Sequence, residues 1–126
     1  MKLRFDKNSL RLRVKRSDLE KLREHHFILE TIDFPNGAFE YKLTISDHID
    51  EISAWLQGQS IEVNIPSGIA ASWMNSDETG IYHSLPLGMN SGMEIIIEKD
   101  FPCKDRPDED KSDYFTELAE EAPVKC

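Results

Sequence analysis

The sequence predicts an α+β fold, mostly β, in which two related β-β-α-β-β halves pack as a pseudo-two-fold sheet sandwich or barrel with two short helices. Residues 9–23 and 60–74 each have the pattern of a strand that runs directly into a helix. Hairpin patterns flank both of these corners in the same order. Each half has one apolar sheet face, and packing against the other half would bury it. We therefore predict a single duplicated domain over residues 1–100, with halves of about 1–47 and 48–100.

In the first half, short strands are expected at 2–5 and 9–14. The second of them alternates apolar residues with Arg11 and Arg13, which is typical of a strand with one buried face. Ser17 followed by Glu20 predicts a helix start with a capping box. The helix is expected to end at His25-His26.

The first half continues with a hairpin. A strand is predicted over 27–34, and Asn36-Gly37 suits a tight type I′ turn. The return strand alternates strictly, and its apolar face consists of Phe39, Tyr41, Leu43 and Ile45. A polar connector over 47–50 closes this half.

The second half is predicted to begin with a strand over 51–57, in which Ile52, Ala54 and Leu56 share a face. Gly58-Gln59 forms the turn, and the strand from Ser60 leads to Pro66, which fits a helix start because its missing N–H costs little there. The residues expected to seat this helix on the core are Ile69, Ala70 and Trp73.

The last part of the second half is predicted as a strand over 79–85, a loose connection over 86–92 and a final strand carrying Met93, Ile95 and Ile97. Residues 101–126 are expected to be an acidic tail, partly disordered or docked through side chains such as Tyr114, Phe115 and Leu118.

Charge is distributed unevenly along the chain, whose net charge is −9. Residues 1–25 contain nine Lys or Arg and four acids, a local balance of +5. A basic first segment on an acidic body predicts internal charge complementarity, a protein partner or self-association. Nucleic acid is the less favoured partner, because the long-range field would repel phosphate.

The chain has no run of about 18 apolar residues, so no membrane-spanning helix is predicted. Its start, M-K-L-R-F-D-K-N, lacks the apolar core of a signal peptide, and a cytoplasmic location is expected. Cys103 and Cys126 are expected to be thiols there.

Two resemblances are carried by short segments. N-S-L-R-L-R-V (8–14) and E-K-D-F-P-C-K-D-R (98–106) resemble a small bacterial family of uncharacterised acidic proteins, a domain of unknown function. I-E-V-N-I-P-S-G-I (61–69) is similar to the strand–Pro–helix corner of AbrB and MraZ swapped-hairpin proteins. That likeness implies interleaved β-α-β units, oligomerisation and DNA binding. However, Gln59-Ser60 stands where those proteins usually have Gly-Arg.

The main candidate site is a basic stripe that could bind phosphate or an acidic segment of a partner. Its members are Arg4, Arg11, Arg13, Lys15 and Arg16. The alternative is a solvated strand face whose cations pair with neighbouring acids such as Glu30, Asp33 or Glu40. Trp55 is a second candidate, because it lies on the strand face opposite Ile52 and marks either a covered site or a partner surface.

Other chemistry is not indicated. The histidines at 25, 26, 48 and 83 have no metal-binding spacing, and no phosphate-binding glycine motif or nucleophile motif occurs. Cys103 lies between Pro102 and Lys104, a position that does not mark a reactive thiol. We predict no cofactor, no metal and no catalytic residue.

These observations favour a non-enzymatic binding or interaction module. One alternative is a DNA-binding regulator like AbrB and MraZ, which would use the basic stripe. The other is a small-ligand-binding protein or enzyme with a pocket between the halves.

Overall fold

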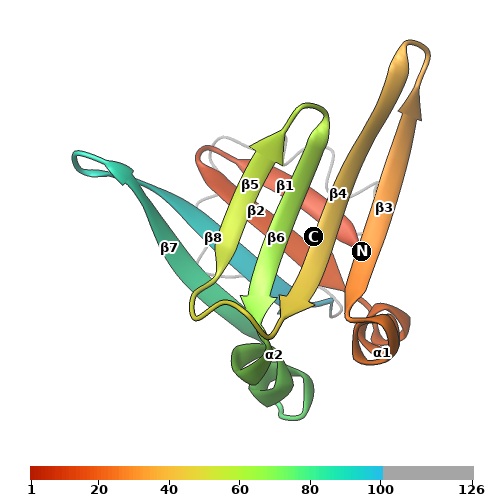
Figure 1. The fold of residues 1–126 in the computed structure, drawn as a ribbon, viewed down its shortest axis with the longest axis vertical. Helices are drawn as coiled ribbons and strands as arrows, with labels where there is room; N and C mark the ends of the chain where they lie inside the picture. The colour runs from red at the N-terminus through yellow and green to blue at the C-terminus, as the bar shows by residue number, and fades with distance from the viewer. Residues whose placement is uncertain (101–126) are drawn as a thin grey trace, which may run out of the picture.

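The computed structural model describes residues 1–100 of the 126-residue chain, which form eight strands and two helices (Figure 1). The predicted tail, residues 101–126, lies outside the described residues. The prediction of an α+β, mostly β fold with two short helices is confirmed. In chain order the elements are β1 (Lys2–Asp6), β2 (Ser9–Val14), α1 (Arg16–His25), β3 (Phe27–Phe34), β4 (Gly37–Ser46), β5 (Ser53–Gln57), β6 (Ser60–Pro66), α2 (Ser67–Met74), β7 (Gly80–Gly88) and β8 (Ser91–Lys99).

The strands form two four-stranded sheets. Sheet A has the order β1-β2-β8-β7 and sheet B the order β3-β4-β6-β5. Each hairpin pairs antiparallel, whereas the central pairs β2–β8 and β4–β6 are parallel. Each sheet therefore takes one hairpin from residues 1–47 and one from residues 48–100, so neither half makes a sheet by itself. The proposed duplication of the two halves stays a prediction.

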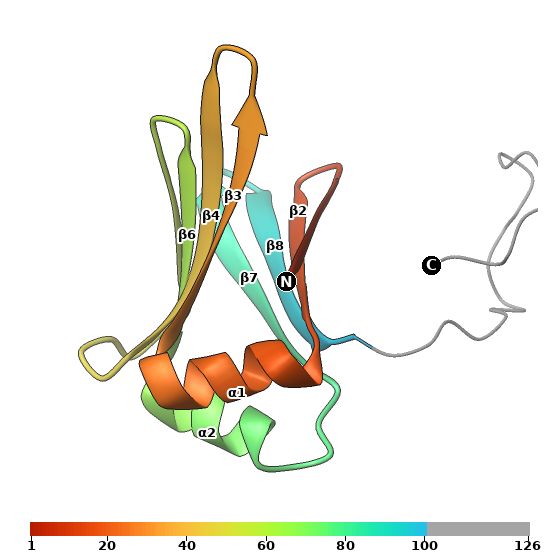
Figure 2. The same ribbon diagram turned by 90° about the vertical axis from the view of Figure 1, so that its right-hand side faces the viewer.

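The two sheets face each other and diverge towards the hairpin turns (Figure 2). Both helices lie at the opposite end, where the sheets come together. This arrangement follows from the chain order, because each helix connects a strand of one sheet to a strand of the other. Neither helix within residues 1–100 is long and apolar enough to cross a membrane.

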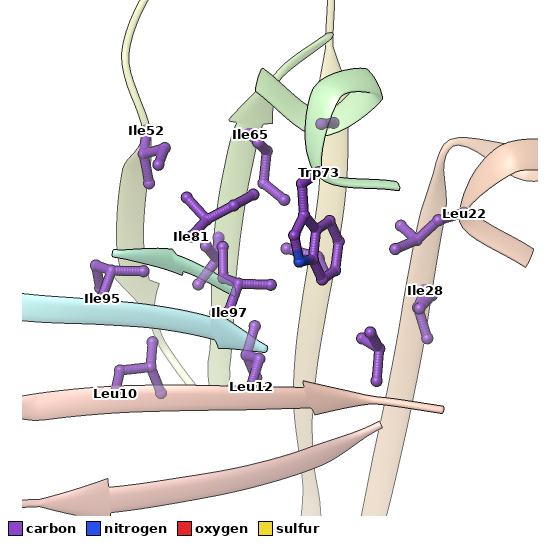
Figure 3. Packing of buried hydrophobic residues seen from close by; sticks show 14 of the residues in the cluster. Leu10, Leu12, Leu22, Ile28, Ile52, Ile65, Trp73, Ile81, Ile95 and Ile97 are labelled. Carbon is purple, nitrogen blue, oxygen red and sulfur yellow. The ribbon is translucent and has the colours of Figure 1, made fainter. Parts of the chain in front are cut away.

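The core lies between the sheets and beside the helices (Figure 3). As the alternation of β2 predicts, Leu10, Leu12 and Val14 are at most 1% exposed. Burial of a side chain of this size stabilises the fold by about 1.5–3 kcal/mol. In α2, Trp73 and Ala70 are fully buried as predicted, but Ile69 is 41% exposed. The prediction for Ile69 was wrong because α2 turns only one narrow face to the core.

Helix α1 begins earlier than its sequence predicts. Its N-cap is Lys15 rather than Ser17, and Asp18 rather than Glu20 supplies the capping carboxylate. The Lys15 amide donates a hydrogen bond of 2.9 Å to Asp18 Oδ2. The helix ends as expected, because His26 has the left-handed conformation (φ 68°) that stops a helix, and its amide donates to Leu22 O.

The segment 86–92, predicted as a loose connection, is part of a long hairpin. Strand β7 continues to Gly88, and β8 begins at Ser91. The loose connection was predicted because Pro86 has no N–H to donate to a strand ladder. The strand continues through Pro86 because β7 is an edge strand, where a proline is tolerated. Positive φ at Gly88 and Asn90 allows the tight turn between the two strands.

Candidate functional site

The predicted basic stripe is divided between two places. Arg4 and Arg11 are cross-strand partners on β1 and β2, and Arg13 is two residues further along the same outer face of sheet A. Lys15 and Arg16 lie beyond the end of β2, at the start of α1. The five residues therefore do not form one continuous surface.

On the outer face of sheet A, arginine side chains surround one carboxylate. Arg11 Nε lies 3.2 Å and Arg13 Nε 3.6 Å from Glu98 Oε1, and the Glu98 side chain is only 9% exposed. Arg13 Nη1 is also 3.9 Å from Asp100 Oδ1. These acids, rather than the predicted Glu30, Asp33 or Glu40, are the partners because β2 pairs with β8. The charges of Arg11 and Arg13 are thus largely compensated within the protein.

Tyr82 completes this cluster from β7. Its hydroxyl donates a hydrogen bond of 3.0 Å to Glu98 Oε2. Burial of the hydroxyl raises the pKa of Tyr82, and the hydrogen bond to Glu98 and the negative charge of Glu98 raise it further. The positive charges of Arg11 and Arg13 lower the pKa, but their effect is smaller. Gly80, opposite Glu98, leaves room for this contact. A Cβ at position 80 would lie 2.9 Å from both Glu98 Cγ and Ile97 O and 3.0 Å from the Tyr82 hydroxyl.

Gly80→Ala is therefore expected to lower the free energy of unfolding by about 1–3 kcal/mol, because the added methyl group overpacks a rigid strand pair. Urea unfolding measures this change. Gly68→Ala is the matched control, since a Cβ there meets nothing within 4 Å and α2 gains a better helix former. The control should be neutral or more stable, and equal stability of both variants would contradict the close packing at Gly80.

A pocket of about 540 Å³ lies between α1 and the segment that follows α2. Because residues seven apart lie on one helix face, Arg16 and Arg23 both point to this side of α1. The lining takes six residues from each half of the chain. They are Val14, Lys15, Arg16, Leu19, Glu20, Arg23, Met74, Ser76, Asp77, Thr79, Lys99 and Asp100.

Two cations hold the walls of the pocket together. Arg23 Nη2 donates to Met74 O at 2.6 Å, which ties α1 to the end of α2. Lys99 Nζ donates to Ser76 O at 2.7 Å and lies 5.8 Å from the centre of the Trp73 ring. Lys15 and Arg16 are exposed, and neither forms an ion pair with another residue of the described range 1–100.

Trp55 lies outside the core, as its strand face predicts. It is on the outer face of sheet B, opposite Glu62 on β6, and is 67% exposed. Residues 1–100 leave most of its surface uncovered. Its role as a partner surface stays a prediction.

A second uncovered apolar region lies on the inner face of sheet B near its turns, and we call it the apolar end of sheet B. Its exposed members are Ile32 (44%), Phe34 (55%) and Leu56 (75%). Phe39 and Ile61 are half-buried between them, since Ile32 pairs with Phe39 and Leu56 with Ile61. Leu56 faces inwards as predicted, but the divergence of the sheets leaves it without a cover.

A small hollow of about 250 Å³ adjoins this apolar end. It is lined by Phe34, Asn36, Gly37, Ala38, Phe39 and Gln59. Sequence reasoning missed this region, because alternation indicates which residues face inwards but not where the facing sheet ends.

A buried ion-pair cluster at the first residue was also not predicted. The Met1 ammonium lies 3.0 Å from Asp18 Oδ2 and 3.1 Å from Glu30 Oε1. The Tyr41 hydroxyl donates to Met1 O at 2.8 Å. Burial raises the pKa of Tyr41, and the negative charges of Glu30 and Asp18 raise it further. No sequence signal links these residues, which come from four different segments.

Metal-binding chemistry has no geometric support within residues 1–100, where no group of three or more His, Cys, Asp or Glu side chains could hold an ion. His26 ends α1 through its backbone, and its side chain is exposed. Cys103 lies outside the described residues.

Comparison with models of protein families identifies the family of this chain. Residues 1–118 match the model of a family described as a family of unknown function, DUF7009. The chain belongs to the DUF7009 family. No curated protein and no solved structure matches it.

For this DUF7009 protein, the predicted resemblance to a domain of unknown function is confirmed. The match covers every described strand and helix of both sheets. The comparisons lend no support to a bacterial origin or to a likeness with AbrB and MraZ. The site must therefore be interpreted from its own geometry.

Proposed function

We propose that this DUF7009 protein is a non-enzymatic interaction module that binds a second copy of itself through the apolar end of sheet B. The observation that carries the proposal is the exposure of Ile32, Phe34 and Leu56 on one continuous sheet face. Apolar residues that are clustered and uncovered mark interaction surfaces in soluble proteins. Aromatic anchors next to a hollow supply most of the binding energy at such surfaces.

The charge distribution favours a second copy as the occupant. The four hairpin turns, residues 6–9, 34–37, 57–60 and 88–91, contain one acid and one base, so their net charge is zero. Two copies of a chain with a net charge of −9 repel each other least at this end. A two-fold contact places the same patch on both subunits, and an uncharged apolar patch is complementary to itself.

The same observations do not favour the DNA-binding alternative. Arg11 and Arg13, which that function would need, are held against Glu98 on sheet A. Counterion release requires cations that are free to neutralise phosphates. A gel shift of the wild-type protein with duplex DNA at low salt would support this alternative, especially if Arg11→Ala/Arg13→Ala abolished it.

The proposal predicts a concentration-dependent dimer in sedimentation velocity experiments. Phe34→Ser/Leu56→Ser should weaken dimerisation by at least about tenfold, because it removes two apolar anchors from each subunit. Both side chains are more than half exposed, so the folded subunit should keep its stability.

The matched control is Phe27→Ser/Trp55→Ser, which removes apolar side chains of similar size from the outer face of the same sheet. The control should dimerise like the wild type. A wild-type protein that is monomeric at all concentrations would refute the proposal and leave a different protein as the partner. Loss of dimerisation only in the control would also refute the proposal, because it would show that the dimer forms through the outer face of sheet B, where Trp55 lies.

A further inference from the structure

We infer that the pocket beside α1 is a binding site for a small organic phosphate. The pocket is lined by residues of α1 and of the segment that follows α2. Both helices lie at the opposite end of the molecule from the hairpin turns (Figure 2), and the apolar end of sheet B is near those turns. The inference therefore does not depend on self-association. It rests on the charge of the pocket lining, on its size and on its mixed polar and apolar walls.

The lining carries an excess of positive charge although the whole chain is acidic. Its cations are Lys15, Arg16, Arg23 and Lys99, and its acids are Glu20, Asp77 and Asp100. Asp100 is compensated from outside the lining, because Lys2 Nζ lies 3.0 Å from its Oδ2. Four cations then face two remaining acids, which leaves an excess of two positive charges. This balance matches a dianion such as a phosphate monoester.

The cations that carry this excess are available and well placed. Lys15 and Arg16 are exposed and have no ion-pair partner within residues 1–100. Arg23 and Lys99 each use a donor on a backbone carbonyl, Met74 O and Ser76 O, and keep further donors. These bonds fix the two side chains before a ligand arrives, which reduces the entropy lost on binding.

The shape of the pocket indicates a ligand with an apolar body. Its volume of about 540 Å³ is larger than inorganic phosphate requires and falls in the range of small-molecule sites. Val14, Leu19 and Met74 provide the apolar part of the lining. An arginine such as Arg16 can bind two phosphate oxygens at once, which makes guanidinium groups selective for this ligand class.

The pocket adjoins a natural fluorescent reporter. Lys99 Nζ is 5.8 Å from the Trp73 ring, so neutralising its charge should change the emission of Trp73. Trp55 is the other tryptophan of the chain, and Trp55→Phe leaves Trp73 as the sole reporter. Trp55 is exposed on β5 of sheet B and does not line the pocket, so Trp55→Phe should not alter the pocket.

The test is a titration of the Trp55→Phe protein with phenyl phosphate, followed by Trp73 fluorescence and by calorimetry. We expect saturable binding that weakens at higher salt, because the attraction is electrostatic and partly exposed. Lys15→Ala/Arg16→Ala should weaken binding by at least about tenfold, since both free cations are lost. Phenol and inorganic phosphate, each carrying one part of the probe, should bind more weakly than phenyl phosphate.

The control variant is Arg4→Ala/Lys7→Ala, which removes the same charge from β1 and its turn, outside the pocket lining. It should bind phenyl phosphate as the wild type does. Absence of saturable binding up to about 10 mM probe would overturn the inference, because a dissociation constant above about 10 mM corresponds to less than about 3 kcal/mol of binding free energy. An equal loss in the control would also overturn it, since binding would then follow net charge alone. Unfolding curves of both variants verify that each remains folded.

Discussion

Replacing Trp73 with alanine is expected to lower the free energy of unfolding by about 3–5 kcal/mol, the largest effect of any single substitution proposed for this protein. The Trp73 side chain is fully buried, and it lies in the core among residues of both sheets and of α1 (Figure 3). Its Nε1 also donates to Thr79 O at 3.3 Å. Small domains are stable by only about 5–15 kcal/mol, so this change removes a large part of the total.

Urea unfolding measures the effect, with Trp55→Ala as the matched control. Trp55 is 67% exposed, so its replacement should change the stability by no more than about 0.5 kcal/mol. The loss of stability in Trp73→Phe should lie between those of Trp73→Ala and Trp55→Ala, because phenylalanine keeps most of the apolar volume but loses the hydrogen bond to Thr79. Similar losses for Trp73→Ala and Trp55→Ala would show that α2 does not anchor the core.

Asp18→Ala is expected to destabilise the protein by about 3 kcal/mol, because it removes one partner of a buried ion pair. The side chain of Asp18 is 7% exposed, and that of Met1 is 0% exposed. The alanine variant leaves the ammonium with Glu30 as its remaining carboxylate within residues 1–100. It also leaves the Lys15 amide without the carboxylate that caps α1.

The contribution of Asp18 should depend on pH in a defined direction. Burial alone would raise the pKa of Asp18, but the Lys15 amide, the Met1 ammonium and Lys21 together hold it below its ordinary value of 3.8. The ionised carboxylate therefore stabilises the folded state above about pH 4, and this stability is lost as the pH falls through the lower folded-state pKa.

Chemical unfolding of the wild type and Asp18→Asn between about pH 2 and pH 7 measures this dependence. Asparagine still accepts from the Lys15 amide, so the comparison isolates the charge. The difference between the two proteins should be constant at neutral pH and shrink below about pH 4. Asp47→Asn, at an exposed position, is the control and should follow the wild-type curve. A difference that does not vary with pH would contradict the role of the charge.

Local patterns predicted the strands and helices because each depends on neighbouring residues. The alternation of Leu10, Leu12 and Val14 sets the buried face of β2 whatever strand lies beside it. The hairpin between β3 and β4 also forms as expected, but the predicted type I′ turn at Asn36-Gly37 was wrong. Gly37 already pairs with Phe34, so the two turn residues are Pro35 and Asn36, and Asn36 does not have the positive φ that a type I′ turn needs. One such signal fails at Pro86, where the ladder with β8 extends an edge strand across a proline.

The candidate sites depend on which strands become neighbours, and no local pattern carries that information. Arg13 and Glu98 lie opposite each other because β2 pairs in parallel with β8. The same pairing brings Lys99 beside Val14, next to the start of α1, and completes the pocket. Alternation predicted that Arg11 and Arg13 face outwards, but it could not show that a carboxylate from the end of the domain meets them.

The parallel pairing within sheet A also governs when the protein can fold. Leu10 pairs with Ile95, so the two central strands of this sheet come from opposite ends of the domain. Closing this loop has an entropic cost that must be met before the strands pair, and topologies dominated by distant contacts fold slowly. During synthesis, the pairing of β2 with β8 cannot form until β8 has emerged. The four strands of sheet B, whose sequence is complete at Pro66, can assemble well before that time.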